Sequence, residues 1–385
     1  RSGGRGSAAR ARGLGVSQAK NWQQMRHALK DFSLPGQNFV FATQGNDIGQ
    51  LSGTWVGQKA NKMPDHLFVT PRKSDQFWKK ISKVDKLPMQ INPPNGIIVS
   101  ANDRPQKTAQ QARVGWFFPA NDRLRRLHQL IDIKSKISLE DIKRFQRDTY
   151  SVSHKKLYDF IMKKAGKIAL STQALIALEA LKNWNGHFDV DSRKAYLYHV
   201  FMAELKERLD KALPIRKTTS SLFRSTGFVP SFIQKDLNQM KADQQNEIID
   251  KALNALKERL QDGKKWGDIH RLRVKHMLAN IPVIGKRYEK ESIALAGHNE
   301  TVFKTYGQIK KNRHQVYYGS QSRHISDLSD INANYFVIFG GQDGIINAES
   351  SYDQIELWKR KQLPIGKCRN CPAHLPTKLS RIWMK

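Results

Sequence analysis

The chain has 385 residues and a formal net charge of +32, because 66 Lys and Arg outnumber 34 Asp and Glu. An apolar fraction of 39% and eight Trp indicate a folded protein, long enough for one large or two ordinary domains. The charge favours acidic partners, anionic surfaces or polyanions, but it is scattered from Lys20 to Lys385, which indicates a solvated basic surface more than a nucleic-acid groove. No apolar run approaches roughly 18 residues, so no membrane span is expected.

The first residues are rich in Gly and Arg and have no apolar period, which predicts a disordered basic leader over residues 1–16. An RNA-binding arm can have this composition, but the segment lacks aromatic residues that would stack on bases. The chain begins at Arg1 rather than Met and carries no signal peptide. We therefore expect a processed product or a piece of something longer.

Residues 34–59 predict a β-hairpin, preceded by an amphipathic helix over residues 17–30. Two strand-length runs, 38–42 and 48–52, flank residues that tolerate the positive φ of a tight connection. Asn38 lies at the entrance of the first strand. Its carboxamide offers two N–H donors at a fixed position, as a site for a developing oxyanion requires, although Asn before a strand also serves simple turn chemistry.

Irregular structure is expected over residues 60–95, and residues 96–100 predict a buried strand bounded by Pro-containing turns. The chain then becomes helical, with Leu, Ile and aromatic stripes that face a core and with a capping-box start at 138–141. No fixed period repeats, which disfavours a helical solenoid. Other predicted helices cover residues 121–133, 154–166, 172–184, 192–213, 237–261 and 268–278.

The C-terminal third contains short β-like runs, followed by a Gly-rich turn at 340–344 and a last helix at 352–361. Strands at both ends and helices in the middle indicate an α+β fold, because the terminal strands must cover their apolar faces. The β-like runs are residues 301–303, 315–318, 324–325 and 335–339.

Motifs that define a chemistry on their own are absent. The sequence has no GxxxxGK[ST] or GxGxxG loop, no HExxH, no EF-hand loop and no paired CxxC. The turn at 340–344 follows a strand as a nucleophile elbow would, but it lacks the GxSxG spacing and the serine. Histidines without ligand spacing are interpreted as surface or satisfied core residues; they are His128, His154, His199, His270, His276 and His324.

Cys368 and Cys371 form a single CxxC, with His374 close by. A structural zinc ion needs four ligands, and a redox site would need a thioredoxin-like context that is missing. A local disulfide or two free thiols are the better interpretations, and they leave the compartment open.

Several segments share a pattern when they are taken in order. They read PGQNFVFAxxGNDIGxxxG at 35–53, NPPNGIIVSANDRP at 92–105, FQRDTYS at 145–151, LKNWNG at 181–186, WGDIHRLRVKH at 266–276 and GGQDGIINAESSYDQIELW at 340–358. In this order they resemble the penicillin acylase family of N-terminal-nucleophile (Ntn) amide hydrolases, which includes penicillin, cephalosporin and acyl-homoserine lactone acylases. The resemblance runs from about Ser17 to Leu363, and it departs from the family pattern at Ile345, where the family tends to have a threonine.

The resemblance implies an α+β fold of the Ntn-hydrolase type, a partial αββα sandwich with a large helical middle section. Residues 17–105 would form the hairpin and strand part of the core, and residues 106–300 the helical section. Residues 301–363 would complete the core, and residues 364–385 would be a tail. The chain would then be the C-terminal part of the large subunit.

The family's chemistry starts from a serine that becomes the first residue of the large subunit when the zymogen is cut. Its hydroxyl attacks the amide, and its own α-amino group, with a pKa of about 8, takes the proton. In the family this serine lies far upstream of the PGQN block, so no nucleophile is expected in this chain. Asn38 fills the position of the family's side-chain oxyanion donor. Gln58 fills the place where the family tends to have an arginine beside the site, and Lys59 could replace it only as a point charge.

The resemblance also implies partners and a location. The substrate would be a small-molecule amide, such as a β-lactam acyl side chain or an N-acyl homoserine lactone. The protein partners would be the missing small subunit and the N-terminal part of the large subunit. No specific nucleic acid is expected as a partner. No cofactor is expected, except a calcium ion by family, with ligands mostly outside this chain. The family implies a periplasmic or secreted protein of antibiotic biosynthesis. Our first hypothesis is an acylase fragment that is inactive alone; the alternative is a basic, non-enzymatic protein that binds nucleic acid or an anionic surface.

Overall fold

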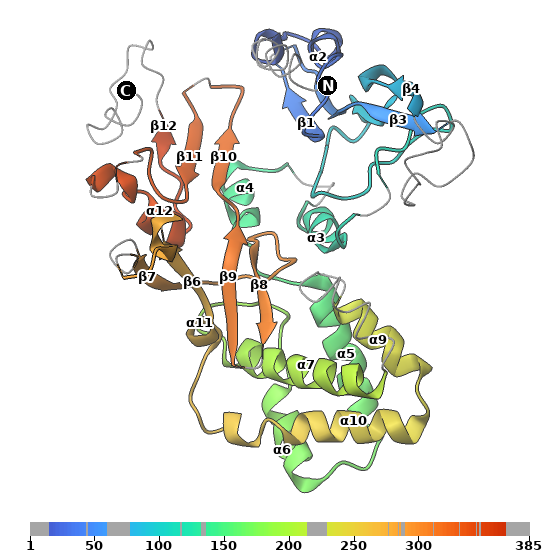
Figure 1. Cartoon of the computed structure of the whole chain (residues 1–385), viewed down its shortest axis with the longest axis vertical. Helices are drawn as coiled ribbons and strands as arrows, with labels where there is room; N and C mark the ends of the chain where they lie inside the picture. Colours follow the sequence, from blue (N-terminus) through green and yellow to red (C-terminus); the bar gives the residue numbers. More distant parts are fainter. Residues whose placement is uncertain are drawn as a thin grey trace. The chain divides into compact units, whose positions relative to one another are not determined.

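The computed structural model describes two compact units, residues 1–124 and 125–385. The described residues are 15–43, 45–59, 78–115, 118–131, 136–213, 229–275, 277–283, 285, 289–310, 312–330, 332–343, 345 and 348–366 (Figure 1). Cys368, Cys371, His374, His276 and residues 1–14 of the predicted leader lie outside these ranges. Helices and several small sheets occur in the same chain, which confirms the predicted α+β class.

The first unit is built on the predicted hairpin, which is confirmed. β1 pairs antiparallel with β2, and β5 adds to the other edge of β2, so the strand order is β1-β2-β5. Asn46 in the connection has a φ of +63°, as a tight turn requires. The elements of this unit are α2 (Trp22–Ala28), β1 (Gln37–Ala42), β2 (Ile48–Gly53), β3 (Val56–Lys59), β4 (Trp78–Ser82), η2 (Val84–Lys86) and β5 (Met89–Ile91).

The predicted buried strand over residues 96–100 is wrong, because these residues belong to none of the sheets and none of them is fully buried. A tight turn ends at the first residue of the segment: Gly96 has a φ of +65°, and its N–H donates to the Pro93 carbonyl at 2.8 Å. The Ile97 N–H donates to Asn95 Oδ1 at 3.3 Å, so it bonds a local side chain rather than a neighbouring strand. The strand that does complete this sheet is β5, which precedes the turn and pairs with β2.

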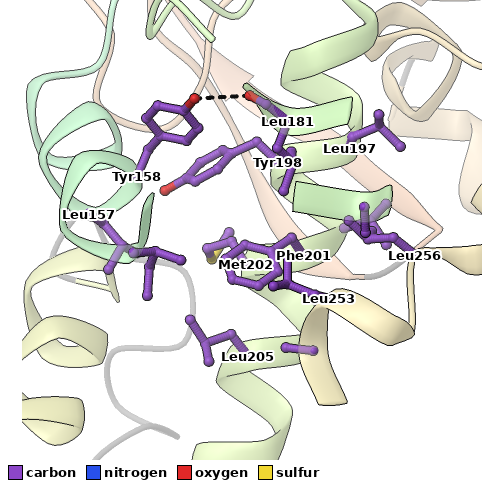
Figure 2. Packing of buried hydrophobic residues seen from close by; sticks show 14 of the residues in the cluster. Leu157, Tyr158, Leu181, Leu197, Tyr198, Phe201, Met202, Leu205, Leu253 and Leu256 are labelled. Atoms are coloured by element: carbon purple, nitrogen blue, oxygen red, sulfur yellow. Dashed lines mark hydrogen bonds between the residues drawn. The ribbon is translucent and has the colours of Figure 1, made fainter. Parts of the chain in front are cut away.

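The helical part of the second unit is arranged around α7, whose buried residues run along most of its length. Leu, Ile, Ala and aromatic side chains from its neighbours pack around it, and Figure 2 shows Phe201, Met202 and Leu205 of α7 inside this cluster. The Tyr158 hydroxyl donates to the Leu181 carbonyl at 2.9 Å, so this buried phenol is satisfied. The helices are α4 (Leu139–Phe145), α5 (Val152–Ala165), α6 (Thr172–Leu181), α7 (Arg193–Ala212), α9 (Val229–Gln239), α10 (Ala242–Asn254), η3 (Lys257–Arg259) and α11 (Trp266–Ile269). The unit boundary falls within α3 (Asp122–Leu130).

Local signals located these helices well. The capping box at Ser138 and Asp141 is confirmed, because each side chain bonds the other residue's backbone N–H. The single helix predicted over residues 237–261 is wrong, since α9 ends at Gln239 and α10 begins at Ala242. None of the helices in the described ranges combines the length and the apolar character that crossing a membrane requires.

The strands of the second unit form two sheets. One has the order β7-β6-β9-β8, in which β6 and β9 are parallel and the outer pairs are antiparallel. The other has the order β10-β11-β12. The elements are β6 (His270–Lys275), η4 (Met277–Asn280), β7 (Glu289–Ala294), β8 (Thr305–Lys310), β9 (Arg313–Gly319), β10 (Ser322–Ser326), β11 (Asn334–Ile338), η6 (Glu349–Ser351), α12 (Ile355–Lys359) and β12 (Ile365–Gly366).

Two predictions in this part are wrong. Residues 268–278 do not form a helix, because α11 ends at Ile269 and β6 follows, with the period-two alternation of buried His270 and Val274 against exposed Arg273. Residues 301–303 are not a strand; the Thr301 hydroxyl accepts from the His298 N–H in a buried turn. The other β-like runs are confirmed within β9, β10 and β11.

Candidate active site

The two faces of β1 have different surroundings. Phe39 and Phe41 point into the core of the first unit, where Phe39 packs edge-on against Phe32 at 5.1 Å between ring centroids. The glycines of β2 make room for these rings, because a Cβ at Gly49 would collide with the Phe41 ring. Successive side chains of a strand alternate between faces, so Asn38 lies on the opposite, exposed face.

Two neighbours orient the Asn38 carboxamide. Its Nδ2 donates to the Ser100 hydroxyl at 2.5 Å, and its Oδ1 accepts from Gln50 Nε2 at 3.1 Å. Gln50 lies diagonally across the β1–β2 pair, on the same face. Because Gln50 bonds the Asn38 oxygen, the Asn38 nitrogen faces Ser100. The nitrogen carries two N–H groups, and the bond to Ser100 uses only one of them.

The segment that carries Ser100 is held by Arg123. Its Nη2 donates to the Ala101 carbonyl at 2.8 Å and to Asn102 Oδ1 at 3.0 Å. The Ala101 N–H donates to Asp103 Oδ1 at 2.9 Å. These bonds fix the backbone next to Ser100, which lies 62 residues from Asn38 in the sequence. Ser100 and Gln50 were missed by the sequence analysis, although both lie inside the family-like blocks that contain or follow Asn38.

Gln58 and Lys59 lie in β3, which belongs to a different sheet from β1. β3 pairs with β4, and the register shifts between these two residues. Their side chains lie outside the described part of the structure, so their roles beside the site stay predictions. The described arrangement therefore consists of Asn38, Gln50 and Ser100, three neutral groups that orient a hydrogen-bond donor.

A second polar cluster lies in the second unit and is fully buried. It contains His154, His199, His270, His298 and His314, with ring centroids of neighbouring pairs 4.4–6.1 Å apart. We call it the histidine cluster. Burial lowers the pKa of His154 to about 3 and that of His199 to about 4. Burial, together with the neighbouring imidazoles, lowers the pKa values of the other three well below the usual range. All five are therefore neutral at pH 7.

The hydrogen bonds of the cluster assign its protons. The Thr305 hydroxyl donates to the Ala296 carbonyl, so it accepts from His270 Nε2 at 2.8 Å. His270 Nδ1 then accepts from His314 Nδ1 at 2.7 Å. This leaves His314 Nε2 as an acceptor without a partner, and both ring nitrogens of His298 are also unpartnered.

The predicted alternatives, surface or satisfied core, are confirmed where the structure describes them: His128 and His324 are exposed, and His154, His199 and His270 are buried and hydrogen-bonded. His298 and His314 were not among the predicted residues.

No group of three His, Cys, Asp or Glu side chains in the described ranges is arranged to hold a metal ion. The calcium expectation is untested by this observation, because its ligands were expected mostly elsewhere. The histidine cluster is a buried structural feature, whereas the exposed Asn38 is open to a ligand.

Comparison with known proteins gives concordant results. The model of the penicillin amidase family matches residues 8–365. Penicillin acylase 2 proenzyme of Pseudomonas sp. (strain SE83) is 23% identical over 352 residues, which are 87% of this chain and 44% of that protein. This chain thus spans less than half the length of that relative. The solved structure of a thermostable penicillin G acylase from Alcaligenes faecalis aligns with a TM-score of 0.66 at 16% identity, over 97% of this chain and 73% of that one, which shows a shared fold.

Proposed function

The chain belongs to the penicillin amidase family, and from this premise we propose that it forms part of a hydrolase of linear amides, in which Asn38 donates a hydrogen bond to the oxyanion. The substrate would be an acyl side chain of the β-lactam or N-acyl homoserine lactone type. The observation that carries the proposal is the orientation of the Asn38 carboxamide by Gln50 on an exposed strand face.

The chemistry of amide hydrolysis explains why such a group is useful. Attack on the carbonyl carbon places a negative charge on its oxygen, and a donor that is already oriented stabilises this charge without reorganising. In the described structure the Ser100 hydroxyl accepts from Asn38. A substrate oxygen would take the second Asn38 N–H or the place of that hydroxyl.

The remaining machinery would come from outside this chain. Asn38, Gln50 and Ser100 are neutral groups, and an attacking group and a base are needed as well. We propose that a serine at the N-terminus of a longer large subunit supplies both, through its hydroxyl and its α-amino group. The αββα sandwich, a calcium ion, a small subunit and a periplasmic or secreted location belong to the same proposal.

The first experiment tests whether the chain is active alone. The purified 385-residue protein is incubated with a phenylacetyl amide, an aliphatic acyl amide and an acyl-homoserine lactone, and release of the amine or lactone is measured. We expect no turnover. Hydrolysis of any of the three would show that a nucleophile lies within this chain.

The second experiment tests Asn38 in a longer protein that carries the upstream serine. Asn38→Ala should lower kcat by about 10² to 10³ while the precursor still folds and is cut. Gln106→Ala is the matched control, because Gln106 is an exposed carboxamide of the same unit that takes no part in the bonds among Asn38, Gln50 and Ser100. Equal turnover of the Asn38→Ala and Gln106→Ala variants would refute the role of Asn38.

A further inference from the structure

One face of the sheet β7-β6-β9-β8 is exposed along β8 and β9, and the proposed amide hydrolysis makes no use of it. In β9, buried His314 and Val316 alternate with Arg313, Gln315 and Tyr317, which are exposed or half-buried. Successive side chains of a strand point to opposite faces, so the latter three lie on the outer face. The inner face belongs to the hydrophobic core of the second unit.

Three tyrosines gather on the outer face, where β8 and β9 lie side by side (Figure 1). Tyr306 of β8 pairs with Tyr318 of β9, and Gly307 pairs with Val316, so Tyr317 is the extra residue of a bulge. Opposite residues of a ladder share a face. The Tyr306 ring confirms the grouping, because its centroid lies 5.6 Å from that of Tyr317 and 6.5 Å from that of Tyr318. We call the outer side of β8 and β9, with these three rings, the tyrosine face.

The three rings are held without covering one another. The plane of Tyr306 is at 84° to that of Tyr317 and at 88° to that of Tyr318, so the contacts are edge-on rather than stacked. Tyr317 and Tyr318 are 55% and 57% exposed. Aromatic rings that are fixed in place and open to solvent are platforms on which planar groups of a ligand stack.

Positive charge lies beside the rings on the same face. Lys310 and Arg313 are both exposed and directly opposite each other, an arrangement of like charges that destabilises a sheet and that an anion would relieve. Arg271 of β6 lies opposite Gln315, and its guanidinium donates to neutral hydroxyl and carbonyl oxygens, so it keeps its charge. None of the residues of β6, β8 and β9 is Asp or Glu.

We propose that the tyrosine face binds single-stranded nucleic acid, with bases stacked on Tyr317 and Tyr318 and phosphates beside Lys310, Arg313 and Arg271. A neutral sugar would use the rings but not the charge, and an acidic peptide would use the charge but bring few planar groups. A single strand presents unpaired bases and phosphates at short, regular intervals, and it therefore matches both.

Such binding follows the chemistry of the bases rather than their order, because every base has a face that stacks. It therefore differs from the specific nucleic-acid recognition that the sequence analysis did not expect. It is also separate from amide hydrolysis and is measured on the chain as it stands, so that failure of either proposal leaves the other intact.

The probe is a fluorescein-labelled oligothymidylate of ten nucleotides, titrated with the protein and followed by fluorescence anisotropy. Its control is an oligomer of the same length and charge in which every base is missing. We expect saturable binding of the oligothymidylate, and a Kd at least about tenfold higher for the abasic oligomer, because each stacked base accounts for roughly five- to 150-fold in affinity. Equal Kd values would indicate attraction of any polyanion and would overturn the proposal, as would a lack of saturable binding.

Two double variants separate stacking from apolar contact. Tyr317→Leu with Tyr318→Leu keeps apolar bulk but removes both rings, and it should raise the Kd of the oligothymidylate at least about tenfold. Tyr317→Phe with Tyr318→Phe keeps both rings and should leave the Kd within about twofold. Both residues are exposed, so the fold should tolerate both changes, and circular dichroism checks this. Equal Kd values for the two double variants would refute stacking on these tyrosines.

A pair of lysine variants tests the charge. Lys310→Gln removes a cation of the tyrosine face, and the slope of log K against log salt concentration should become shallower by about 0.7, the value for one phosphate contact of a single strand. Lys167→Gln is the matched control, because Lys167 is an exposed lysine between α5 and α6. Its slope should equal that of the wild type. Equal slopes for the two variants would show that the strand does not pass Lys310.

Discussion

Asn38 and the histidine cluster both carry hydrogen-bonding groups with unused capacity, but they differ in contact with water. Asn38 lies on an exposed strand face, and its spare N–H can meet solvent or a ligand. His298 and His314 are 1% and 0% exposed, and their unpartnered nitrogens face other side chains. An unmade hydrogen bond is thus available for binding at the hairpin, whereas in the second unit it costs stability.

Lowering the pH should produce the largest difference between the two regions, because the histidine cluster is ionisable and the Asn38 arrangement is not. The pKa of each clustered imidazole is lower in the folded protein than its ordinary value of about 6.5, so the unfolded chain binds more protons below that pH. The stability that comes from keeping these imidazoles neutral is fully present above about pH 6.5. It is lost as the pH falls toward about 4 and about 3, the pKa values of His199 and His154 in the folded protein. Each histidine contributes about 1.4 kcal/mol per pH unit in this window.

Urea unfolding at pH 7, 6 and 5 measures this loss. For five histidines we expect the free energy of unfolding to fall by an amount on the order of 10 kcal/mol between pH 7 and pH 5. The loss is detected by near-ultraviolet circular dichroism of the second unit's aromatic residues. The hairpin residues Asn38, Gln50 and Ser100 are not ionisable, so their geometry should not respond directly. An unfolding free energy that is the same at pH 7 and pH 5 would contradict the neutral state of the cluster.

Gly49→Ala tests the buried side of the hairpin. The added methyl group would collide with the Phe41 ring, with Ile91 Cδ1 2.9 Å away, and such overpacking costs about 1–3 kcal/mol. Hydrogen exchange of the β1 and β2 amides should become faster, while that of α7 stays unchanged. Gly96→Ala is the comparison, because the new methyl group would have open space around it. Only the φ of +65° makes this substitution unfavourable, so it shows the backbone effect without the collision. Unchanged exchange in β1 would show that Phe41 is not tightly packed.

His298→Phe tests the cost of the unpartnered nitrogens. The ring lies between Phe188 at 4.5 Å and His314 at 4.8 Å, so a phenyl ring has similar neighbours and brings no unpaired polar atoms. We expect the free energy of unfolding to rise by about 1–2 kcal/mol at pH 7. Below about pH 6.5 the variant should take up about one proton fewer on unfolding, so its stability should depend less on pH. Both are measured by the same urea series. A loss of stability together with an unchanged dependence on pH would contradict the assignment of two unpartnered nitrogens to a neutral His298.

Gln50→Leu tests how the exposed carboxamide is oriented. Without the Gln50 bond, Asn38 loses the partner of its oxygen but keeps its donor, so kcat of the longer, serine-bearing protein should fall only about tenfold, consistent with the loss of roughly 1.4 kcal/mol. KM should stay near the wild-type value if Gln50 acts through Asn38 alone. Equal kcat values in the variant and the wild type would show that Ser100 orients Asn38 by itself.

The features that could be predicted from the sequence are those determined by residues close together in the chain. The turn residues around Asn46 and the capping box at Ser138 lie within a few positions of the elements they define. The contact between Asn38 and Ser100 joins positions 62 apart, and no local pattern encodes it. The histidine cluster likewise draws on α5, α7, β6, β9 and the loop before β8, so each histidine taken singly gave no indication of the others. Apolar residues in WGDIHRLRVKH fit a helical period and a strand period alike, which explains why β6 was predicted as a helix.

Trp266 of α11 stacks on His270, with the ring centroids 4.5 Å apart and the planes at 17°, and its Nε1 donates to the Gly297 carbonyl at 3.0 Å. Its ring also lies 5.0 Å from His199, 5.5 Å from His314 and 5.6 Å from His298. An imidazolium quenches the fluorescence of an indole that it contacts, whereas a neutral imidazole does so much less. The fold therefore places an optical reporter against four of the five imidazoles, and the emission of Trp266 would register the first proton that enters the cluster.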